Sequence, residues 1–286
     1  MPEPSSPDPG KPEIYDLHCH STASDGSLSP TAVVQRAFER GVTALALTDH
    51  DTTAGLAEAR LCATAAGIKL IPGIELSAQW QKQCFHIVGL GIDPDYAPLA
   101  EATHLLQGTR MCRAEKIAEK LAQKHIPGAL EAVMKAAGDG MVTRSHFADF
   151  LVAGHHVDSQ QDAFDRYLAK GKPAYVATPW AELAQAVAWI IESGGVAVLA
   201  HPLRYNLTAN KMKKLLAVFK EAGGQGMEIV TGRISPDEIR RAAHFAKSFG
   251  LSGSMGSDFH SPDQWVELGR LAALPTGIQP VWELLD

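Results

Sequence analysis

The stretch Ile14-Tyr15-Asp16-Leu17-His18-Cys19-His20 is an apolar run that ends in two histidines. Alternate side chains of a β-strand share one face, so Asp16, His18 and His20 are expected to project to the same side. Two imidazoles at this spacing can bind one metal ion, and a nearby carboxylate can orient a ring through its second nitrogen. Asp16 is predicted to orient a ligand. Two surface histidines placed by chance are the alternative for this motif alone.

Length and composition bound the class of protein. The 286 residues suit one large α/β domain or a domain with an insertion, and 45% hydrophobic with 20% charged residues is typical of a globular protein. The net charge of −6 argues against a general nucleic-acid coat but allows a locally basic pocket. No apolar run reaches the roughly 20 residues of a membrane span. Residues 1–12 hold five prolines and are predicted to be a disordered leader.

The four cysteines are scattered and show no C-x-x-C spacing. This pattern predicts free thiols and a cytoplasmic protein. Histidine is unusually frequent, with 12 residues against 26 lysines and arginines. No obligate protein partner and no membrane association are expected.

Strand and helix patterns alternate along most of the chain. Strands are predicted at 14–20, 43–48, 68–71 with a continuation through 72–77, 84–89, 196–200, 227–230 and 252–256. Helices are predicted at about 30–40, 53–66, 181–193, 209–221 and 235–250. Such alternation favours parallel strands linked by helical crossovers, and therefore an α/β fold.

Residues 101–179 show helical patterns and no convincing strand. We expect them to form a helical insertion (cap) domain on a barrel made of residues 13–100 and 180–286. A basic stripe follows one helix of this block: Arg110, Arg113, Lys116, Lys120 and Lys124. The stripe is interpreted as a solvated face, with guidance of a short RNA as the functional alternative. Trp180, Trp189 and Trp265 are expected to pack in the interior.

Ionisable residues recur at or just beyond the carboxyl ends of the predicted strands. They are His18, His20, Asp25, His50, Glu75, His86, His201, Asp258 and His260. In a barrel of parallel strands these ends converge on one face. Burying so many ionisable groups together requires cations to neutralise them. Asp49 and Asp51 flank His50 and are predicted to face solvent or to cap a helix.

The ligand types narrow the chemistry. Histidine and carboxylate without thiolate suit Mn²⁺, Fe²⁺ or Zn²⁺. Nine candidate ligands are too many for one ion and fit three. Clustered metal ions suit displacement at phosphorus, because they polarise phosphoryl oxygens and lower the pKa of a bound water.

Six motifs together resemble the PHP (polymerase and histidinol phosphatase) family of metal-dependent phosphoesterases. They are DLHCHSTASDG at 16–26, LTDHD at 47–51, GIELS at 73–77, CFHIVG at 84–89, AHP at 200–202 and GSDFH at 256–260. The resemblance spans nearly the whole barrel and implies a distorted (β/α)7 TIM-like barrel with three divalent ions, Mn²⁺ first among them. It assigns His18, His20, Glu75 and Asp258 to one ion, Glu75, His86 and His201 to a second, and Asp25, His50 and His260 to a third.

The block between His86 and His201 is similar to the branch that removes the 3′-phosphate of nucleoside 3′,5′-bisphosphates. That branch converts pAp to AMP and phosphate by attack of a metal-bridged hydroxide, and is also associated with 5′→3′ trimming of short, 5′-phosphorylated RNA. Arg144 and Arg204 are expected to bind the second phosphate through their planar forks. His146 is expected to contact phosphate or to protonate the leaving oxygen. Ser77 and Asn206 are weaker candidates for the pocket.

Other functions stay open at this point. Histidinol-phosphate phosphatases share the barrel motifs. An amidohydrolase or deaminase also has a His-x-His barrel strand, but would leave phosphate-binding arginines without a task. A non-catalytic, metal-stabilised module is the alternative from another class. Arg144 could also be an exposed arginine at a helix start, and Arg204 a residue of a surface loop.

Overall fold

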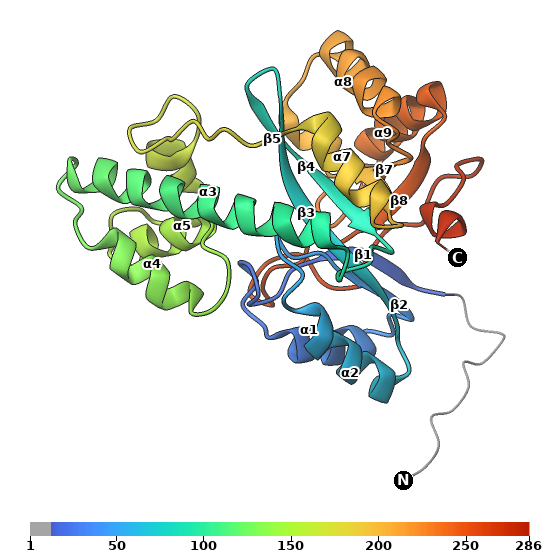
Figure 1. Cartoon of the computed structure of the whole chain (residues 1–286), viewed down its shortest axis with the longest axis horizontal. Helices are drawn as coiled ribbons and strands as arrows, with labels where there is room; N and C mark the ends of the chain where they lie inside the picture. Colours follow the sequence, from blue (N-terminus) through green and yellow to red (C-terminus); the bar gives the residue numbers. More distant parts are fainter. Residues whose placement is uncertain (1–12, 286) are drawn as a thin grey trace.

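The computed structural model describes residues 13–285, and the predicted leader 1–12 lies outside this range. The barrel contains β1 (Tyr15–Cys19), α1 (Pro30–Glu39), β2 (Ala44–Leu47), α2 (Leu56–Ala66), β3 (Lys69–Trp80), β4 (Gln83–Leu90), β5 (Ala181–Glu182), α7 (Leu183–Glu192), β6 (Val196–Leu199), α8 (Ala209–Glu221), β7 (Gly226–Thr231), α9 (Pro236–Phe249) and β8 (Ser252–Gly256). Helices α1 and α2 lie below the strands and α7, α8 and α9 above them and to the right in Figure 1. The predicted α/β alternation is confirmed.

The strands form a nearly closed, barrel-like sheet. Their order is β1-β2-β3-β4-β6-β7-β8, with β5 paired to β3. The two ends of this path meet, because the Asp258 amide donates to the His18 carbonyl at 2.7 Å and the His20 amide to the Phe259 carbonyl at 2.9 Å. A Cβ on Gly256 would lie 2.3 Å from the Cβ of His18, so only glycine allows this approach of β8 to β1. The predicted TIM-like barrel with seven strands along its path is confirmed.

The expectation of uniformly parallel strands is wrong at β4. Strand β3 runs unbroken through Pro72-Gly73, and β4 then pairs antiparallel with both β3 and β6. The turn between β3 and β4 is only two residues long, and Gln81 and Lys82 have φ values of 50° and 59°. Two positive φ values define the type I′ turn, whose twist matches that of an antiparallel pair. A hairpin therefore replaces the expected helical crossover.

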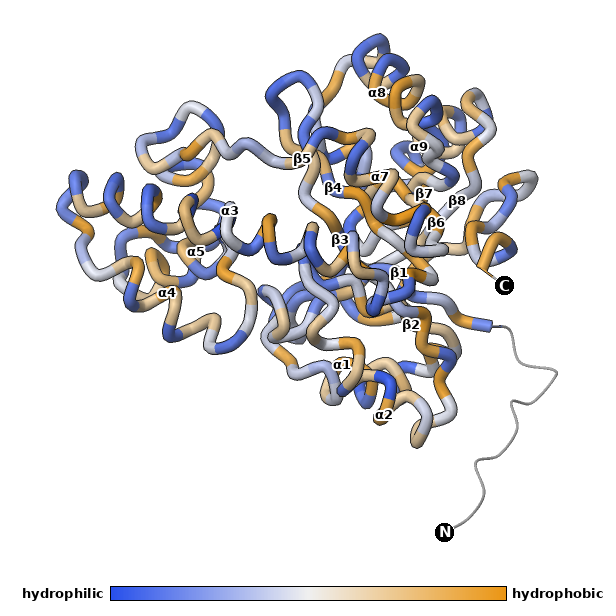
Figure 2. Tube along the Cα trace, viewed as in Figure 1, coloured by the Kyte–Doolittle hydropathy of each residue, from blue (hydrophilic) through white to orange (hydrophobic). Residues whose placement is uncertain are grey.

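Helix termini follow the local sequence. Ser29 caps α1 by accepting from the Ala32 amide, with Pro30 in the first turn. Ser235 and Glu238 form a capping box at the start of α9. In the hydropathy colouring of Figure 2 the hydrophobic strands β4, β6 and β7 gather in the middle of the molecule. Among residues 13–285 no helix is both long and apolar enough to span a membrane, and the four cysteines are free.

The helical block projects to one side of the barrel (Figure 1). It contains most of α3 (Ala97–Ala122), α4 (Ala129–Ala137), α5 (Arg144–Ala153), α6 (Gln160–Ala163) and a π-helical turn (Phe164–Leu168). These helices enclose an apolar cluster of their own, which includes Ile117, Leu121, Val133, Phe147 and Leu151. The division of the chain at residues 101 and 179 stays a prediction, since α3 runs from Ala97 into the block without a break.

Candidate metal centre and substrate pocket

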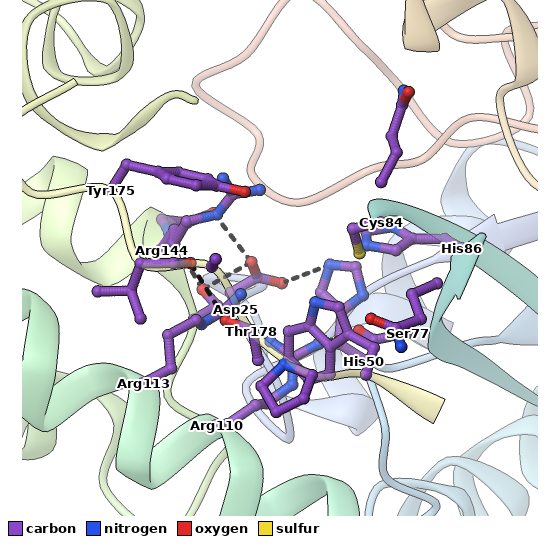
Figure 3. Close-up of a pocket in the computed structure, with 18 of the residues that line it drawn as sticks. Asp25, His50, Ser77, Cys84, His86, Arg110, Arg113, Arg144, Tyr175 and Thr178 are labelled. Carbon is purple, nitrogen blue, oxygen red and sulfur yellow. Dashed lines mark hydrogen bonds and ion pairs between the residues drawn. The ribbon is translucent and has the colours of Figure 1, made fainter. Parts of the chain in front are cut away.

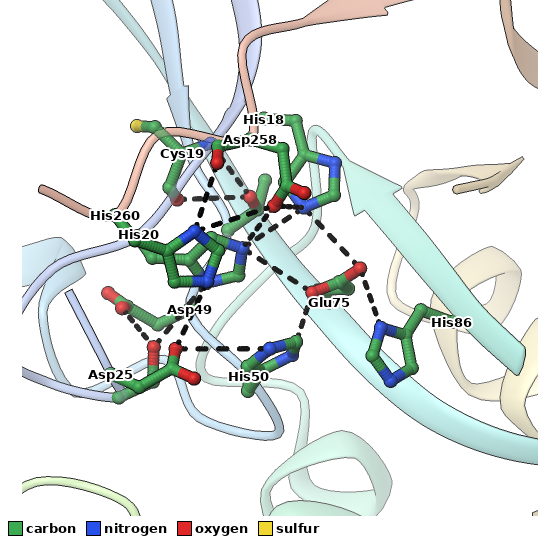
Figure 4. A network of polar contacts seen from close by, with 12 residues as sticks. His18, Cys19, His20, Asp25, Asp49, His50, Glu75, His86, Asp258 and His260 are labelled. Atoms are coloured by element: carbon green, nitrogen blue, oxygen red, sulfur yellow. Dashed lines mark hydrogen bonds and ion pairs between the residues drawn. The ribbon is translucent and has the colours of Figure 1, made fainter. Parts of the chain in front are cut away.

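The two histidines of β1 face the same point. His18 and His20 are fully buried, and their Nε2 atoms lie 3.1 Å apart. The Asp258 Oδ1 lies 3.4 Å from the first and 3.2 Å from the second, and the Glu75 Oε1 lies 3.4 Å from His18 Nε2. Ligand atoms bound to one ion at about 2.1 Å lie about 3 Å apart, so this spacing fits a shared cation. Figure 4 shows the convergence of these side chains.

Glu75 lies at the centre of the cluster. Its Oε1 is 3.0 Å from His86 Nδ1 and 3.1 Å from His201 Nε2. Its Oε2 is 2.7 Å from His50 Nδ1 and 3.4 Å from His20 Nε2. One fully buried carboxylate thus faces rings from four different segments, an arrangement suited to bridging two ions.

Asp25 links the cluster to the cap. Its Oδ1 faces His260 Nε2 at 3.4 Å and His50 Nε2 at 3.9 Å. Its Oδ2 accepts hydrogen bonds from the hydroxyls of Thr143 and Ser145, both at 2.9 Å. The first turn of α5 therefore fixes the orientation of a barrel carboxylate.

The polar atoms of this centre fit divalent cations. Asp25 Oδ1, His50 Nδ1, Glu75 Oε2 and His201 Nδ1 are buried and have no hydrogen-bond partner among residues 13–285. Although His50 Nδ1 and Glu75 Oε2 lie 2.7 Å apart, they are not aligned as a hydrogen bond. Buried polar atoms left in this state are costly unless an ion satisfies them. Three groups in the cluster have the spacing of a metal site: His20, Asp25, His50 and His260; His18, His20 and Glu75; and His50, Glu75 and His86.

The carboxylates and rings of this centre shift one another's pKa values. Although burial opposes the shift, Glu75 raises the pKa of His86 to about 10 and Asp25 raises the pKa of His260 to about 9, so a bound cation would have to replace the protons of these two rings. Burial alone would raise the pKa of Glu75, but the neighbouring rings of His86, His50 and His18 hold it well below its usual range. Burial lowers the pKa of His50 to about 4, so its ring is neutral at pH 7. Ionised carboxylates and neutral imidazoles are the forms that coordinate metal.

The prediction that every ligand lies at a strand end is wrong for Glu75 and His86, which lie within β3 and β4. They still join the cluster because β4 runs the opposite way. Its first half therefore lies at the barrel end where the parallel strands finish, with His86 opposite Ser77 and beside Ala200. The parallel bridge between His50 and Glu75 completes the approach.

Glu228 is a supporting residue that sequence reasoning missed. It lies within the apolar strand β7, and only 1% of it is exposed. Its Oε1 is 2.7 Å from His18 Nδ1, and its Oε2 accepts from the His201 amide at 2.5 Å. The sequence did contain an indication of this residue, because Glu228 is the one charged residue in the segment GMEIVT at 226–231. Glu228 holds the tautomer of His18 and the backbone of His201, whose φ is 29°.

Three aspartates near the ligands behave differently from expectation. Asp16 orients no ring; it accepts the amides of Ser257 at 2.8 Å and Gly269 at 2.9 Å, and so fixes the chain next to Asp258. Asp49 and Asp51 are buried, and α2 has Gly55 as its N-cap with no side-chain cap, so the predicted exposure and the alternative of a helix cap are both wrong. Asp49 accepts the Ser21 amide and hydroxyl at 2.8 and 2.7 Å.

A pocket of about 470 Å³ lies between the cap and the metal centre (Figure 3). Its barrel wall includes the candidate ligands Asp25, His50, His86 and His260. Its cap wall includes three arginines, Arg110, Arg113 and Arg144, together with Tyr175 and Trp180. We call it the arginine pocket.

The three arginines are not equivalent. Arg110 is committed to Asp51, with Nε 2.7 Å from Oδ2, and donates to the Ser77 hydroxyl at 3.0 Å. Arg113 and Arg144 have no carboxylate partner within residues 13–285. Their guanidinium carbons instead lie 4.8 Å from the ring centre of Trp180 and 5.6 Å from that of Phe164. Two unpaired cations therefore face the pocket.

The expectation of a solvated basic stripe is wrong for its first two members. Arg110 and Arg113 are only 3% and 9% exposed, whereas Lys116 and Lys124 are exposed. Burial, and then the charges of Arg110 and Arg144, lower the pKa of Arg113 to about 9. Trp180 is buried as expected, but Trp265 is 93% exposed, so its predicted packing is wrong.

The predicted substrate residues fall into three places. Arg144 and Ser77 line the arginine pocket. His146 accepts the Thr143 amide on Nδ1 at 3.1 Å and lines a second cavity. Arg204 pairs with Asp258 Oδ2 and, with Asn206, lines a smaller third cavity of about 250 Å³. Their roles stay predictions.

Comparison with known proteins decides the family. The PHP domain model matches residues 16–231. The chain belongs to the PHP family. It is 48% identical over 275 residues to the 5′-3′ exoribonuclease Rnm of Escherichia coli, covering 96% of this chain and 94% of that one. It is 41% identical over 273 residues to the 3′,5′-nucleoside bisphosphate phosphatase of Chromobacterium violaceum, covering 95% and 96%.

The fold agrees with a solved PHP-type structure. A Chromobacterium violaceum protein, called an amidohydrolase and solved with bound sulfate and no metal, superposes with a TM-score of 0.92. It is 41% identical, and the match covers 95% of both chains. This PHP-family chain is thus an enzyme, a metal-dependent phosphoesterase, whose relatives act on nucleotide or RNA phosphoesters.

Proposed function

We propose that this PHP protein hydrolyses the 3′-phosphate of nucleoside 3′,5′-bisphosphates and converts pAp to AMP and phosphate. The nine candidate ligands would hold three divalent ions, with Mn²⁺ the first to test. The observation that carries the proposal is the pair of unpaired guanidinium groups, Arg113 and Arg144, beside the metal centre. A substrate with one phosphate, bound at the metal centre, would leave these two guanidinium groups without an anion to bind.

The charge distribution supports one phosphate at each end of the pocket. The 3′-phosphate belongs at the ligands, and the 5′-phosphate at Arg113 and Arg144, whose forks bind two oxygens at once. Arg110 is already neutralised by Asp51 and serves to position α3. Tyr175 leaves an aromatic face in the pocket for the base.

Bound divalent ions would supply polarisation of the phosphoryl oxygens and a water of lowered pKa. The chain's own residues do the rest. Thr143 and Ser145 hold Asp25 toward His50 and His260, so hydrogen bonds connect the cap to the candidate ligand set. His146 accepts on Nδ1, which places its proton on Nε2. We propose that this proton goes to the leaving oxygen.

Exoribonuclease activity is the second candidate, because the Escherichia coli relative carries that name. The two reactions break the same bond. In pAp and at the 5′ end of RNA, water adds to the phosphorus on the 3′-oxygen, the bond between phosphorus and that oxygen breaks, and the oxygen takes a proton. RNA differs only in a second ester on the phosphorus, so its downstream chain leaves with a 5′-phosphate.

The test compares substrates that differ by one group. Phosphate release in Mn²⁺ is measured on pAp, 3′-AMP, 5′-AMP and histidinol phosphate, and nucleotide release on a 5′-phosphorylated oligonucleotide. 3′-AMP keeps the scissile phosphate of pAp and lacks only the 5′-phosphate. A clear preference for pAp over 3′-AMP is expected. Equal turnover of the two, a preference for histidinol phosphate, or turnover of amides alone would overturn the proposal.

Arg144→Ala provides the matching variant. It removes charge-assisted hydrogen bonds to the 5′-phosphate, which are worth about 1.5–3 kcal/mol, or about 10- to 150-fold in kcat/KM. The loss is expected on pAp and not on 3′-AMP. Equal losses on both substrates would show that Arg144 has another role.

A further inference from the structure

The metal centre is open on two sides. A second cavity of about 560 Å³ shares Asp25, Ser145 and His260 with the arginine pocket. Two of these residues are candidate ligands (Figure 4). A group bound to the phosphorus at this centre can therefore extend into either cavity.

The two cavities differ in charge. The arginine pocket is lined by four basic residues, Lys82 and the three arginines. No lysine or arginine of the described chain lines the second cavity. Its walls carry hydroxyl, amide and carboxylate groups, among them Thr22, Ser27, Asp149, Gln160, Ser261 and Asp263. Such a surface disfavours a phosphate and suits the hydroxyl and amino groups of a neutral nucleoside.

An exposed tryptophan is the next residue of the chain after the segment that lines the second cavity. Trp265 follows directly on Asp263 and Gln264, which line the cavity, and precedes the buried Val266. The loop is thus anchored at His260 on one side and at Val266 on the other. A tryptophan that is 93% exposed offers an unused ring face. Aromatic faces of this kind stack on nucleobases without regard to sequence.

We infer that the second cavity is the subsite for the nucleoside immediately downstream of the scissile phosphate of RNA, with Trp265 stacking on a downstream base. The inference rests on the proposed function and extends it. pAp fills only the arginine pocket and the metal centre. RNA carries one more nucleoside on the same phosphorus, and a cavity of this volume is in the range that holds small organic ligands.

Filling the cavity tests the inference. Ala136 lies on the exposed face of α4, lines the second cavity but not the arginine pocket, and is not a candidate ligand, so Ala136→Trp narrows this cavity while every candidate ligand keeps its residue type. Activity in Mn²⁺ is compared on pAp and on the 5′-phosphorylated dinucleotide pApA. The variant is expected to lower kcat/KM on pApA by about tenfold or more, because misplaced substrates react poorly. Turnover of pAp is expected to stay unchanged. Ala65→Trp, an exposed site on α2, is the matched control and should affect neither substrate.

Trp265 gives an independent test. Trp265→Ala should lower kcat/KM on a 5′-phosphorylated tetranucleotide by about tenfold, the scale of one base stack, while Trp265→Phe keeps most of the activity. Thermal unfolding confirms that each variant is folded. Equal effects on pAp and RNA, or no effect on RNA, would overturn the inference. So would a wild type that hydrolyses pAp but not pApA, which would leave the proposed function standing. A wild type inactive on both would refute both.

Discussion

Arg113, which we propose binds the 5′-phosphate, is expected to lower the free energy of unfolding of the protein. Its guanidinium is buried with no carboxylate partner within residues 13–285, and burial, followed by the charges of Arg110 and Arg144, lowers its pKa to about 9. A base whose folded pKa is lowered destabilises the fold at every pH below that value, and the penalty falls as pH rises above about 9. At 1.36 kcal/mol per pKa unit, the penalty at pH 7 is at most about 5 kcal/mol.

One contact reduces this destabilisation. The cation–π contact with Trp180 returns about 1–2 kcal/mol, and a methionine at position 113 would keep part of that packing. Arg113→Met is therefore expected to stabilise the protein by at most about 3–4 kcal/mol, which for a chain of this size corresponds to a rise in Tm of at most about 6–8 °C. The measurement is thermal unfolding in a buffer free of phosphate and sulfate, because such anions would bind the wild-type pocket and mask the difference.

Arg110→Met is the matched control, one helical turn away. It leaves the fully buried Asp51 carboxylate without its cationic partner, so it should lower the free energy of unfolding by about 3–5 kcal/mol. In activity assays Arg113→Met should raise KM for pAp by about tenfold or more and leave 3′-AMP turnover unchanged. A lower Tm for Arg113→Met, or an unaltered KM for pAp, would refute the view that this charge is held for a phosphate.

Three further outcomes follow from the centre itself. Glu228→Gln weakens the hold on His18, so Mn²⁺ affinity by calorimetry should fall about 10- to 100-fold, while Glu221→Gln on the surface of α8 should have no effect. Burial lowers the pKa of His146 below its usual 6.5, so its neutral ring contributes stability above pH 6.5 that is lost on acidification below it. His146→Gln should therefore reduce the fall of Tm between pH 6.5 and 5. An unchanged slope would show that the titration of His146 does not cause this fall. Asp25→Asn should abolish turnover with metal bound; retained turnover would favour a structural role for the ions.

Most of the candidate metal ligands could be predicted from short sequence motifs. Ligands that sit in short, contiguous motifs, such as His18 and His20 or Asp258 and His260, are recognisable because strand geometry alone places them together. The alternation of strands and helices likewise gave the α/β barrel, since hydrophobic periodicity is a local property. The direction of β4 was missed, because a two-residue turn with positive φ at Gln81 and Lys82 has no distinctive residue such as glycine or asparagine.

The sequence by itself determined the family and the order of the candidate metal ligands along the chain. Only the tertiary structure showed which arginines of the pocket have no carboxylate partner within residues 13–285. Arg110 and Arg113 look like a solvated stripe along the chain, and they become buried because Asp51 and Trp180, distant in sequence, pack against α3. Glu228 and the second cavity also depend on contacts between separate segments. Long-range packing sets the burial and pairing of a charge, and therefore whether it is free to bind a phosphate.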